Sequence, residues 1–318
     1  MAELAIIIGN GFDIDLGLPS KYSEFVNSKE WERLVQSLNS FPEEEYRNHS
    51  LICHLLSAAY DKENWFDIEE EIRSFVLKHP KCTENEIREI ESEFNRLKVA
   101  LANYLKRVSN NYTVDEEKWA CQFMYKFEFY DRPMIEIYYN YTNPYAFLPR
   151  PLFHINTKKF KTYVHGSLED NDIVLGCDIQ DGEQVNRHLS FMYKYNMLNN
   201  ANHVARNLLE AKEVVFFGHS VNEMDFGYFR EFFKVASTTP KPIRHLTFIT
   251  LDEKSERRIK DNIRNQGISV IDLYNNLESF TFIHTKKLYS QNAKEIQKWD
   301  DMFERIFRKE ERGVKRRN

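Results

Sequence analysis

The stretch Leu4-Ala5-Ile6-Ile7-Ile8-Gly9-Asn10-Gly11 stands near the start of the chain and decides the fold. Its first five residues are all apolar, and a glycine follows them directly. A short uninterrupted apolar run is typical of a strand buried on both faces, and such strands usually belong to parallel sheets. We therefore expect residues 4–8 to form the first strand of a parallel sheet.

The residues after this run suit a tight turn against a ligand. Gly9 and Gly11 allow the backbone to turn sharply and approach a phosphate, and a following helix would offer free N–H groups to it. We expect Gly9, Asn10, Gly11, Phe12 and Asp13 to bind a cofactor. A dinucleotide fingerprint would have a third glycine at position 14, which is isoleucine here. A simple strand-to-helix turn is therefore the alternative.

Further strand-like runs occur later in the chain and alternate with helical patterns. They lie at 134–139, 161–164, 173–175, 214–217, 246–251 and 268–273. Strands that alternate with helices predict an α/β fold with a doubly wound, mostly parallel sheet.

A long helical stretch interrupts this alternation after the first strand. Its clearest helix spans 83–108, where apolar residues recur at steps of three and four. We expect a nucleotide-binding core of residues 1–19 and 131–290, a helical insertion at 20–130, and a C-terminal helix with a basic tail at 291–318. The 83–108 helix is expected to pack within the protein; the alternative is a pairing face for a homo-oligomer.

Composition excludes several classes of protein. The chain has 318 residues and is 42% hydrophobic, which is enough for a core and argues against disorder. Its four cysteines form no Cys-x-x-Cys pair, so we expect neither a cysteine-built metal site nor a disulfide framework. A net charge of −5 gives no signal for nucleic-acid binding. No apolar segment is long enough to cross a membrane, so we expect a cytoplasmic protein.

Two strand ends carry candidate catalytic residues. Asn140 follows the run at 134–139, and its amide can hold a ribose hydroxyl or a water; the alternative is an Asn turn. His165 follows the run at 161–164, where an imidazole is suited to accept a proton; the alternative is a structural histidine.

A second glycine turn follows the run at 214–217. We expect Gly218, His219 and Ser220, with Asp225 a few residues later, to bind a second phosphate or a ribose. A Gly-x-Ser-x-Gly hydrolase elbow is excluded because Asn222 stands where its second glycine would be.

Two further groups of charged residues lie in helical segments. Asp67 and Glu71 are one helical turn apart and follow Trp65, which is typical of a solvated face or of the rim of a site. The spacing of Arg73 and His79 fits that of helical toxin ribonucleases loosely, and we treat this as a minor competing hypothesis.

The order of these strand-end motifs resembles that of the sirtuin-like NAD-binding fold, which is a Rossmann-like fold. More closely, most of the chain resembles the bacterial abortive infection AbiH family. The resemblance is carried by GNGFDIDLGLPSKYSEF from Gly9, WFDIE from Trp65, NYT from Asn140, HGS from His165 and FGHSVNEMD from Phe217.

The sirtuin resemblance holds at some positions and fails at others. Gly9-Asn10-Gly11 matches the sirtuin Gly-Ala-Gly loop, Asn140 the catalytic Asn, His165-Gly166 the His-Gly pair, and Gly218-His219-Ser220 the Gly-Thr-Ser turn. Thr142 replaces the acid that follows the sirtuin Asn, and zinc cysteines are missing. These departures argue against protein deacylation.

The resemblance implies a role in bacterial defence against phage. The mechanism expected from it is hydrolysis of the nicotinamide–ribose bond of NAD, with Asn140 positioning the ribose or the water and His165 as general base. An active enzyme of this kind would stay latent until a phage-encoded trigger acted. The alternative is a non-catalytic sensor or interaction module that binds NAD or a related nucleotide.

Overall fold

The computed structural model describes residues 3–38, 49–61, 67–113, 115–127, 130–147, 159–179, 183, 185–197, 204–239 and 245–308. Its centre is a six-stranded sheet in which every neighbouring pair is parallel. The order is β3-β2-β1-β4-β5-β6. The strands are β1 (Leu4–Ile8), β2 (Met134–Tyr138), β3 (Lys159–Tyr163), β4 (Glu213–Phe217), β5 (His245–Thr250) and β6 (Ser279–His284). The expected doubly wound α/β fold is confirmed, and the strand order reverses its direction between β1 and β4.

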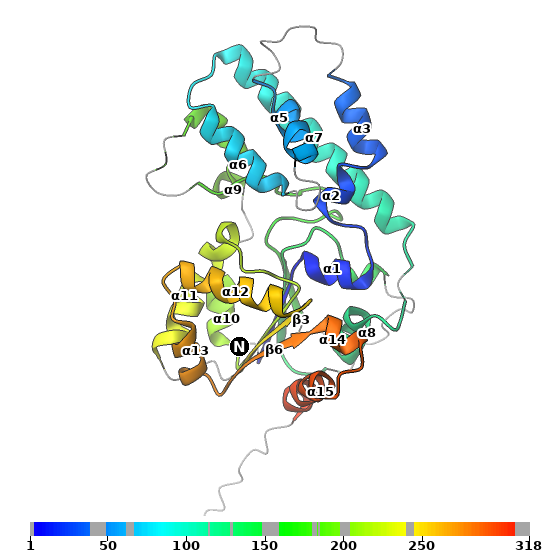
Figure 1. The fold of residues 1–318 in the computed structure, drawn as a ribbon, viewed down its shortest axis with the longest axis vertical. Helices are drawn as coiled ribbons and strands as arrows, with labels where there is room; N and C mark the ends of the chain where they lie inside the picture. Colours follow the sequence, from blue (N-terminus) through cyan, green and yellow to red (C-terminus); the bar gives the residue numbers. More distant parts are fainter. Residues whose placement is uncertain are drawn as a thin grey trace, which may run out of the picture.

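Both faces of the sheet are covered, which explains the uninterrupted apolar run of β1. Ile6 and Ile8 belong to one hydrophobic cluster, and Ala5 and Ile7 belong to the other. Helices α10 (Val204–Glu210), α11 (Glu223–Thr238), α12 (Glu253–Asn265) and α13 (Val270–Asn276) cover one face; α1 (Asn10–Leu16), α8 (Trp119–Lys126) and α15 (Ala293–Phe307) cover the other. Figure 1 shows these groups of helices on either side of the sheet.

A separate group of helices, which we call the helical layer, lies above α1 in Figure 1. It consists of α2 (Tyr22–Phe25), α3 (Lys29–Gln36), α5 (Leu51–Asp61), α6 (Ile68–Lys78) and α7 (Glu84–Asn110). The long helix α7 begins at a capping box, where Thr83 accepts from Glu86 N and the Glu86 side chain accepts from Thr83 N. The Tyr104 hydroxyl of α7 donates to the Pro19 carbonyl at 2.7 Å, which joins the layer to the segment after α1.

Helix α8 does not belong to the helical layer, although it falls within the expected insertion at 20–130. It packs against α1, where the Ala120 amide donates to Asp15 at 2.8 Å, and its Phe123 contacts Phe217 of β4. The helical insertion therefore returns to the sheet before β2 begins.

Two predicted strands are wrong. The run at 268–273 falls largely in helix α13, because Ser269 caps it by accepting from the Asp272 amide. The last strand, β6, comes after that helix. The run at 173–175 is not a strand, and an isolated bridge joins Cys177 to Tyr193 just beyond it. Short elements complete the described chain: η2 (Pro144–Phe147), η3 (Arg187–Met192), α9 (Lys194–Met197) and α14 (Thr285–Tyr289).

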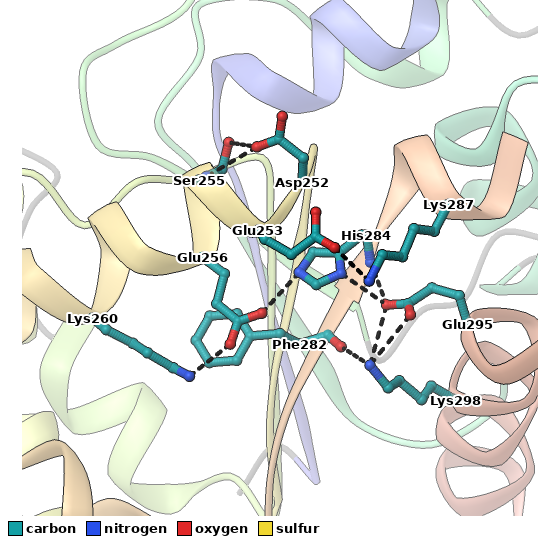
Figure 2. A network of polar contacts seen from close by, with 10 residues as sticks. All are labelled: Asp252, Glu253, Ser255, Glu256, Lys260, Phe282, His284, Lys287, Glu295 and Lys298. Carbon is teal, nitrogen blue, oxygen red and sulfur yellow. Dashed lines mark hydrogen bonds and ion pairs between the residues drawn. The ribbon is translucent and has the colours of Figure 1, made fainter. Parts of the chain in front are cut away.

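A network of charged side chains fastens α15 to the end of β6 (Figure 2). Glu295 of α15 accepts from the backbone amide of His284 at 2.7 Å and lies 3.3 Å from Lys298 Nζ. The Nε2 atom of the same His284 lies 2.8 Å from the Glu256 carboxylate of α12. The network thus ties one helix from each side of the sheet to the same strand end.

Within the described residues, no helix is both long and apolar enough to cross a membrane.

Candidate functional site

The four strand-end motifs meet at one edge of the sheet. Gly9 follows β1, Asn140 follows β2, His165 follows β3 and Gly218 follows β4. Because these strands are adjacent and parallel, their carboxyl ends lie at the same edge. This edge includes the point between β1 and β4 where the strand order reverses, and ligands of open α/β sheets bind at such points.

The two glycine turns pack directly on each other. The Gly11 amide donates to the Gly218 carbonyl at 2.9 Å, and the Gly9 amide donates to the Phe217 carbonyl at 3.0 Å. A Cβ atom on Gly9 would lie 2.8 Å from the Gly218 oxygen, and one on Gly218 would lie 2.1 Å from the Phe12 nitrogen. Contact between the two backbones therefore explains these glycines, and the Gly11 amide is already engaged.

Other members of the predicted binding turns lie at the margin of this contact. Asn10 is exposed, and its side chain accepts from the Ser20 hydroxyl at 2.6 Å. The Phe12 ring is buried against Phe217. Ser220 is partly buried, and its carbonyl accepts from Asn262 of α12 at 3.0 Å.

The first polar cluster of the site is formed by Asp13, Asn140 and Thr142, which we call the Asp13 cluster. Asp13 stands in the first turn of α1 and is 1% exposed. The Asn140 amide donates to its Oδ1 at 2.7 Å, and the Thr142 hydroxyl donates to its Oδ2. Burial raises the pKa of Asp13 to about 7, against the lowering effect of these two donors. The Asp13 carboxyl therefore changes its protonation near neutral pH.

The second polar cluster surrounds a buried lysine, and we call it the Lys194 cluster. Lys194 is 1% exposed, and its Nζ lies 2.7 Å from Glu69 Oε2, 3.3 Å from His165 Nδ1 and 3.8 Å from Asp225 Oδ1. The other ring nitrogen of His165, Nε2, lies 3.1 Å from the same Asp225 oxygen. Lysine is almost never fully buried unless it is paired, and here it has two carboxylates.

The charges of the Lys194 cluster determine one another. Burial alone would lower the pKa of Lys194 and raise that of Asp225, but their mutual attraction, with the help of Glu69 and His165, reverses both shifts. Lys194 is therefore held as the ammonium and Asp225 as the carboxylate. Burial and the Lys194 charge lower the pKa of His165, so its ring is neutral at pH 7.

Glu69 belongs to the Lys194 cluster, and sequence reasoning missed its role and that of Lys194. Burial raises the pKa of Glu69 to about 7, and the Lys194 charge opposes this rise. The signal was the helical spacing, because Glu69 is in line with Ile72 and Val76 on the buried face of α6. Asp67 caps this helix by accepting from the Glu69 and Glu70 amides. Trp65 lies outside the described residues.

Helix α11 and the turn before it hold Asp225 and His219. Asn222 caps α11 by accepting from the Asp225 amide at 2.9 Å, which fixes the carboxylate in the first turn. His219 Nδ1 accepts from the Val221 amide at 2.9 Å, and its Nε2 lies 3.6 Å from Asp225. Val221 has a φ of +49°, which is unfavourable for a β-branched residue. The backbone is thus strained in the second glycine turn, which follows β4.

Tyr139 packs between the two histidines. Its ring centroid lies 4.3 Å from that of His219 and 5.4 Å from that of His165. Tyr139 immediately precedes Asn140 in the chain, so this ring and the Asp13 cluster are joined through consecutive residues. The two polar clusters therefore both lie at the carboxyl edge of the sheet, linked by the segment that follows β2.

The site contains buried acceptors and donors that the protein leaves without a partner. Asn140 is 5% exposed, and its Oδ1 has no hydrogen-bond partner among the described residues. The same is true of the Tyr139 hydroxyl. Buried side-chain polar atoms are mostly hydrogen-bonded to protein or water. The Asn140 carbonyl oxygen is therefore available to accept a hydrogen bond from a water or a ligand.

The ribonuclease hypothesis gains no support from the geometry. Arg73 forms an ion pair with Glu183, and the His79 ring stacks on Phe75 at the end of α6. Each residue thus has structural partners of its own. In the part of the chain that the structure describes, no group of three or more His, Cys, Asp and Glu side chains is arranged to hold a metal ion.

The fold and the site define an α/β protein with a doubly wound sheet and a buried polar centre at its topological switch point. The chain belongs to the bacteriophage abortive infection AbiH family, whose model matches residues 5–244. This membership supports a role in abortive infection as a defence against phage. Comparisons with curated proteins and with solved structures found no match.

Proposed function

We propose that this protein carries out abortive infection by hydrolysing the nicotinamide–ribose bond of NAD at the carboxyl edge of the sheet. Loss of NAD would stop the metabolism of the infected cell before phage are released. The family membership supports the defence role. The reaction and its substrate are proposed from the chemistry of the Asp13 cluster and of His165.

The observation that carries the proposal is the unpartnered Oδ1 of Asn140, which lies beside a buried carboxyl group. Cleavage of the C1′–N bond leaves a ribose with oxocarbenium character, and a water oxygen must then bond to C1′. A carbonyl acceptor next to a carboxylate can hold the sugar hydroxyls or the water, and the carboxylate can stabilise the developing positive charge.

The reaction also needs an acceptor for one proton. Nicotinamide leaves with the electron pair of the broken bond, and the attacking water gives up a proton as ADP-ribose forms. Asp13 and His165 both lie at the carboxyl edge of the sheet, and the pKa of Asp13, about 7, is near the working pH, where a group exchanges protons efficiently. The site thus offers both polar functions that the hydrolysis requires.

A second function is favoured by a different observation. The Gly11 amide is already engaged by the Gly218 carbonyl, and the Asn140 amide nitrogen by Asp13. With these donors engaged inside the protein, the loop can bind a nucleotide while neither donor is left to act on the nicotinamide–ribose bond. The protein would then be a nucleotide-binding sensor of infection.

The two functions are distinguished by NAD levels in phage-infected cells that carry variants at matched protein abundance. We expect Asn140→Ala and His165→Ala each to slow triggered NAD loss by at least about a hundredfold, the lower range of acid–base catalysis. The exposed His188→Ala serves as the matched control and should leave NAD loss unchanged. Protection that persists while NAD stays intact would favour the sensor.

A further inference from the structure

His165 is poorly placed to accept the proton of the attacking water. Lys194 has only donors, so it donates to His165 Nδ1 at 3.3 Å, and the proton of the neutral ring therefore sits on Nε2, 3.1 Å from Asp225. Both ring nitrogens thus face a charged neighbour, Lys194 at Nδ1 and Asp225 at Nε2. The adjacent Lys194 charge also opposes protonation of the ring, which lowers its pKa.

Asp13 is better placed for this role. A carboxylate has about four lone-pair sites, and the Asn140 and Thr142 donors occupy two of them. The unpartnered Asn140 Oδ1 belongs to the same side chain that binds Asp13. A water in this cluster could donate one hydrogen to Asn140 Oδ1 and the other to Asp13, which leaves its oxygen lone pairs free to attack.

We propose that Asp13 is the catalytic base for NAD hydrolysis and that the attacking water is held between Asp13 and Asn140 Oδ1. This assignment rests on the proposed function, and it supplies the acid that is missing at Thr142 after the catalytic Asn. The carboxylate comes from α1 instead of from the segment after β2. His165 is a positioning residue, fixed by Lys194 and Asp225.

The step balances in atoms and charge. The water oxygen bonds to C1′ of the ribose while the C1′–N bond breaks. The electron pair of the C1′–N bond stays with the nicotinamide ring nitrogen and neutralises its positive charge. One water proton moves to Asp13, which becomes a neutral carboxylic acid and later returns the proton to solvent. The products are nicotinamide and ADP-ribose, and the step needs no oxidant or reductant.

The surroundings of Asp13 fit this cycle. Thr142 and Asn140 face it from the segment after β2, and Tyr163 of β3 is near enough to interact with it electrostatically. Burial raises the pKa of Asp13 to about 7, where a general base is both present as the anion and strong enough to accept a proton.

The test compares Asp13→Asn, Thr142→Val and His165→Gln in extracts of phage-infected cells at saturating NAD. The rate of nicotinamide release by the wild type should rise with pH up to about 7. Asp13→Asn should lower this rate by at least about a hundredfold and remove its pH dependence, while NAD binding is retained. His165→Gln should lower the rate but keep the pH dependence.

Thr142→Val keeps the carboxyl group and guards against misfolding of Asp13→Asn. The loss of a donor that lowers the pKa of Asp13 should move the rise in rate to higher pH. If Asp13→Asn keeps the wild-type rate, or if only His165→Gln removes the rise in rate with pH, the assignment of Asp13 as the base is wrong. The proposed NAD hydrolysis would still stand in either case. A wild type that releases no nicotinamide would overturn the proposed function as well.

Discussion

At the scale of single residues, the site depends on glycines for a reason that the sequence did not reveal. From the sequence we expected Gly218 to bind a phosphate or a ribose; the structure shows its backbone packed closely against Gly11 and Phe12. Its φ of +69° also lies in the left-handed region. Gly218 is thus constrained both by its left-handed backbone and by close contacts around its α-carbon. Gly267 shares only the first constraint: its φ is +79°, and a Cβ there would have no neighbouring atom within 4 Å.

Gly218→Ala should therefore destabilise the protein more than Gly267→Ala. The shared left-handed conformation costs about 1–2 kcal/mol in each variant. The added contact with Phe12 should cost Gly218→Ala about 1–3 kcal/mol more, as overpacking does in protein cores. Chemical denaturation of both variants measures the difference, and equal losses would show that the two turns are not in close contact.

Asp13 should make stability depend on pH in the direction opposite to that of an ordinary paired carboxylate. Its pKa is 3.8 when unfolded and about 7 when folded, so the folded protein binds the extra proton between these values. Its stabilising contribution is complete below pH 3.8 and is lost as the pH rises to about 7.

Asp13→Asn removes this titration. The stability of the wild type relative to Asp13→Asn should fall between pH 5 and pH 7 by about 1.4 kcal/mol per pH unit at most. Urea denaturation at the two pH values measures the change. The exposed Asp300→Asn should stay within about 0.5 kcal/mol of the wild type at both. A difference that does not vary with pH would contradict the raised pKa of Asp13.

At the scale of elements, one ion pair joins the helical layer to the strand ends. Glu69 of α6 and Lys194 of α9 lie 2.7 Å apart, and Lys194 in turn holds His165 after β3. A change in the position of α6 would therefore alter the charge beside His165. This contact couples the helical layer electrostatically to the Lys194 cluster.

Lys194→Met should lower stability by roughly 3–5 kcal/mol, because it leaves buried carboxylates without their cation. Lys29→Met is the matched control, since Lys29 is likewise the first residue of its helix but is exposed. This control should change stability by about 0.5 kcal/mol or less. Equal thermal denaturation curves for the two variants would show that the Lys194 cluster does not hold the helical layer.

The C-terminal helix is fastened by a comparable buried acceptor. Glu295 accepts from the His284 amide and faces Lys298 (Figure 2). Glu295→Gln should cost about 1–3 kcal/mol, since it weakens hydrogen bonds that a charged acceptor makes in the interior. Glu304→Gln, an exposed change in the same helix, should cost about 0.5 kcal/mol or less. Similar midpoints of urea denaturation would contradict the role of this network.

At the scale of the whole molecule, the parallel sheet could be predicted because its central strands are buried on both faces. Residues 4–8 and 214–217 read as apolar runs for that reason. The strand β6 could not be predicted in this way, because Phe280 and Phe282 alternate with polar residues near the edge of the sheet. The run at 268–273, which precedes β6, was wrongly predicted to be a strand. So short an apolar run does not distinguish a strand from a capped helix.

The site could be predicted only in part, for a similar reason. Glycine turns and polar residues directly after apolar runs mark strand ends, so Gly9, Asn140, His165 and Gly218 were found from the sequence. Lys194 and Glu69 are 125 residues apart and stand in no motif. Charged residues normally indicate a solvated surface, and only the folded chain shows that these two neutralise each other inside the protein.

The central claim is that the carboxyl-edge site hydrolyses NAD, and one measurement tests it most directly. Nicotinamide and ADP-ribose are quantified by mass spectrometry in extracts of phage-infected cells that express the protein. We expect the two products to appear in equal amounts as NAD is lost, and both to disappear with Asn140→Ala. Protection against phage while NAD remains intact and neither product appears would contradict it.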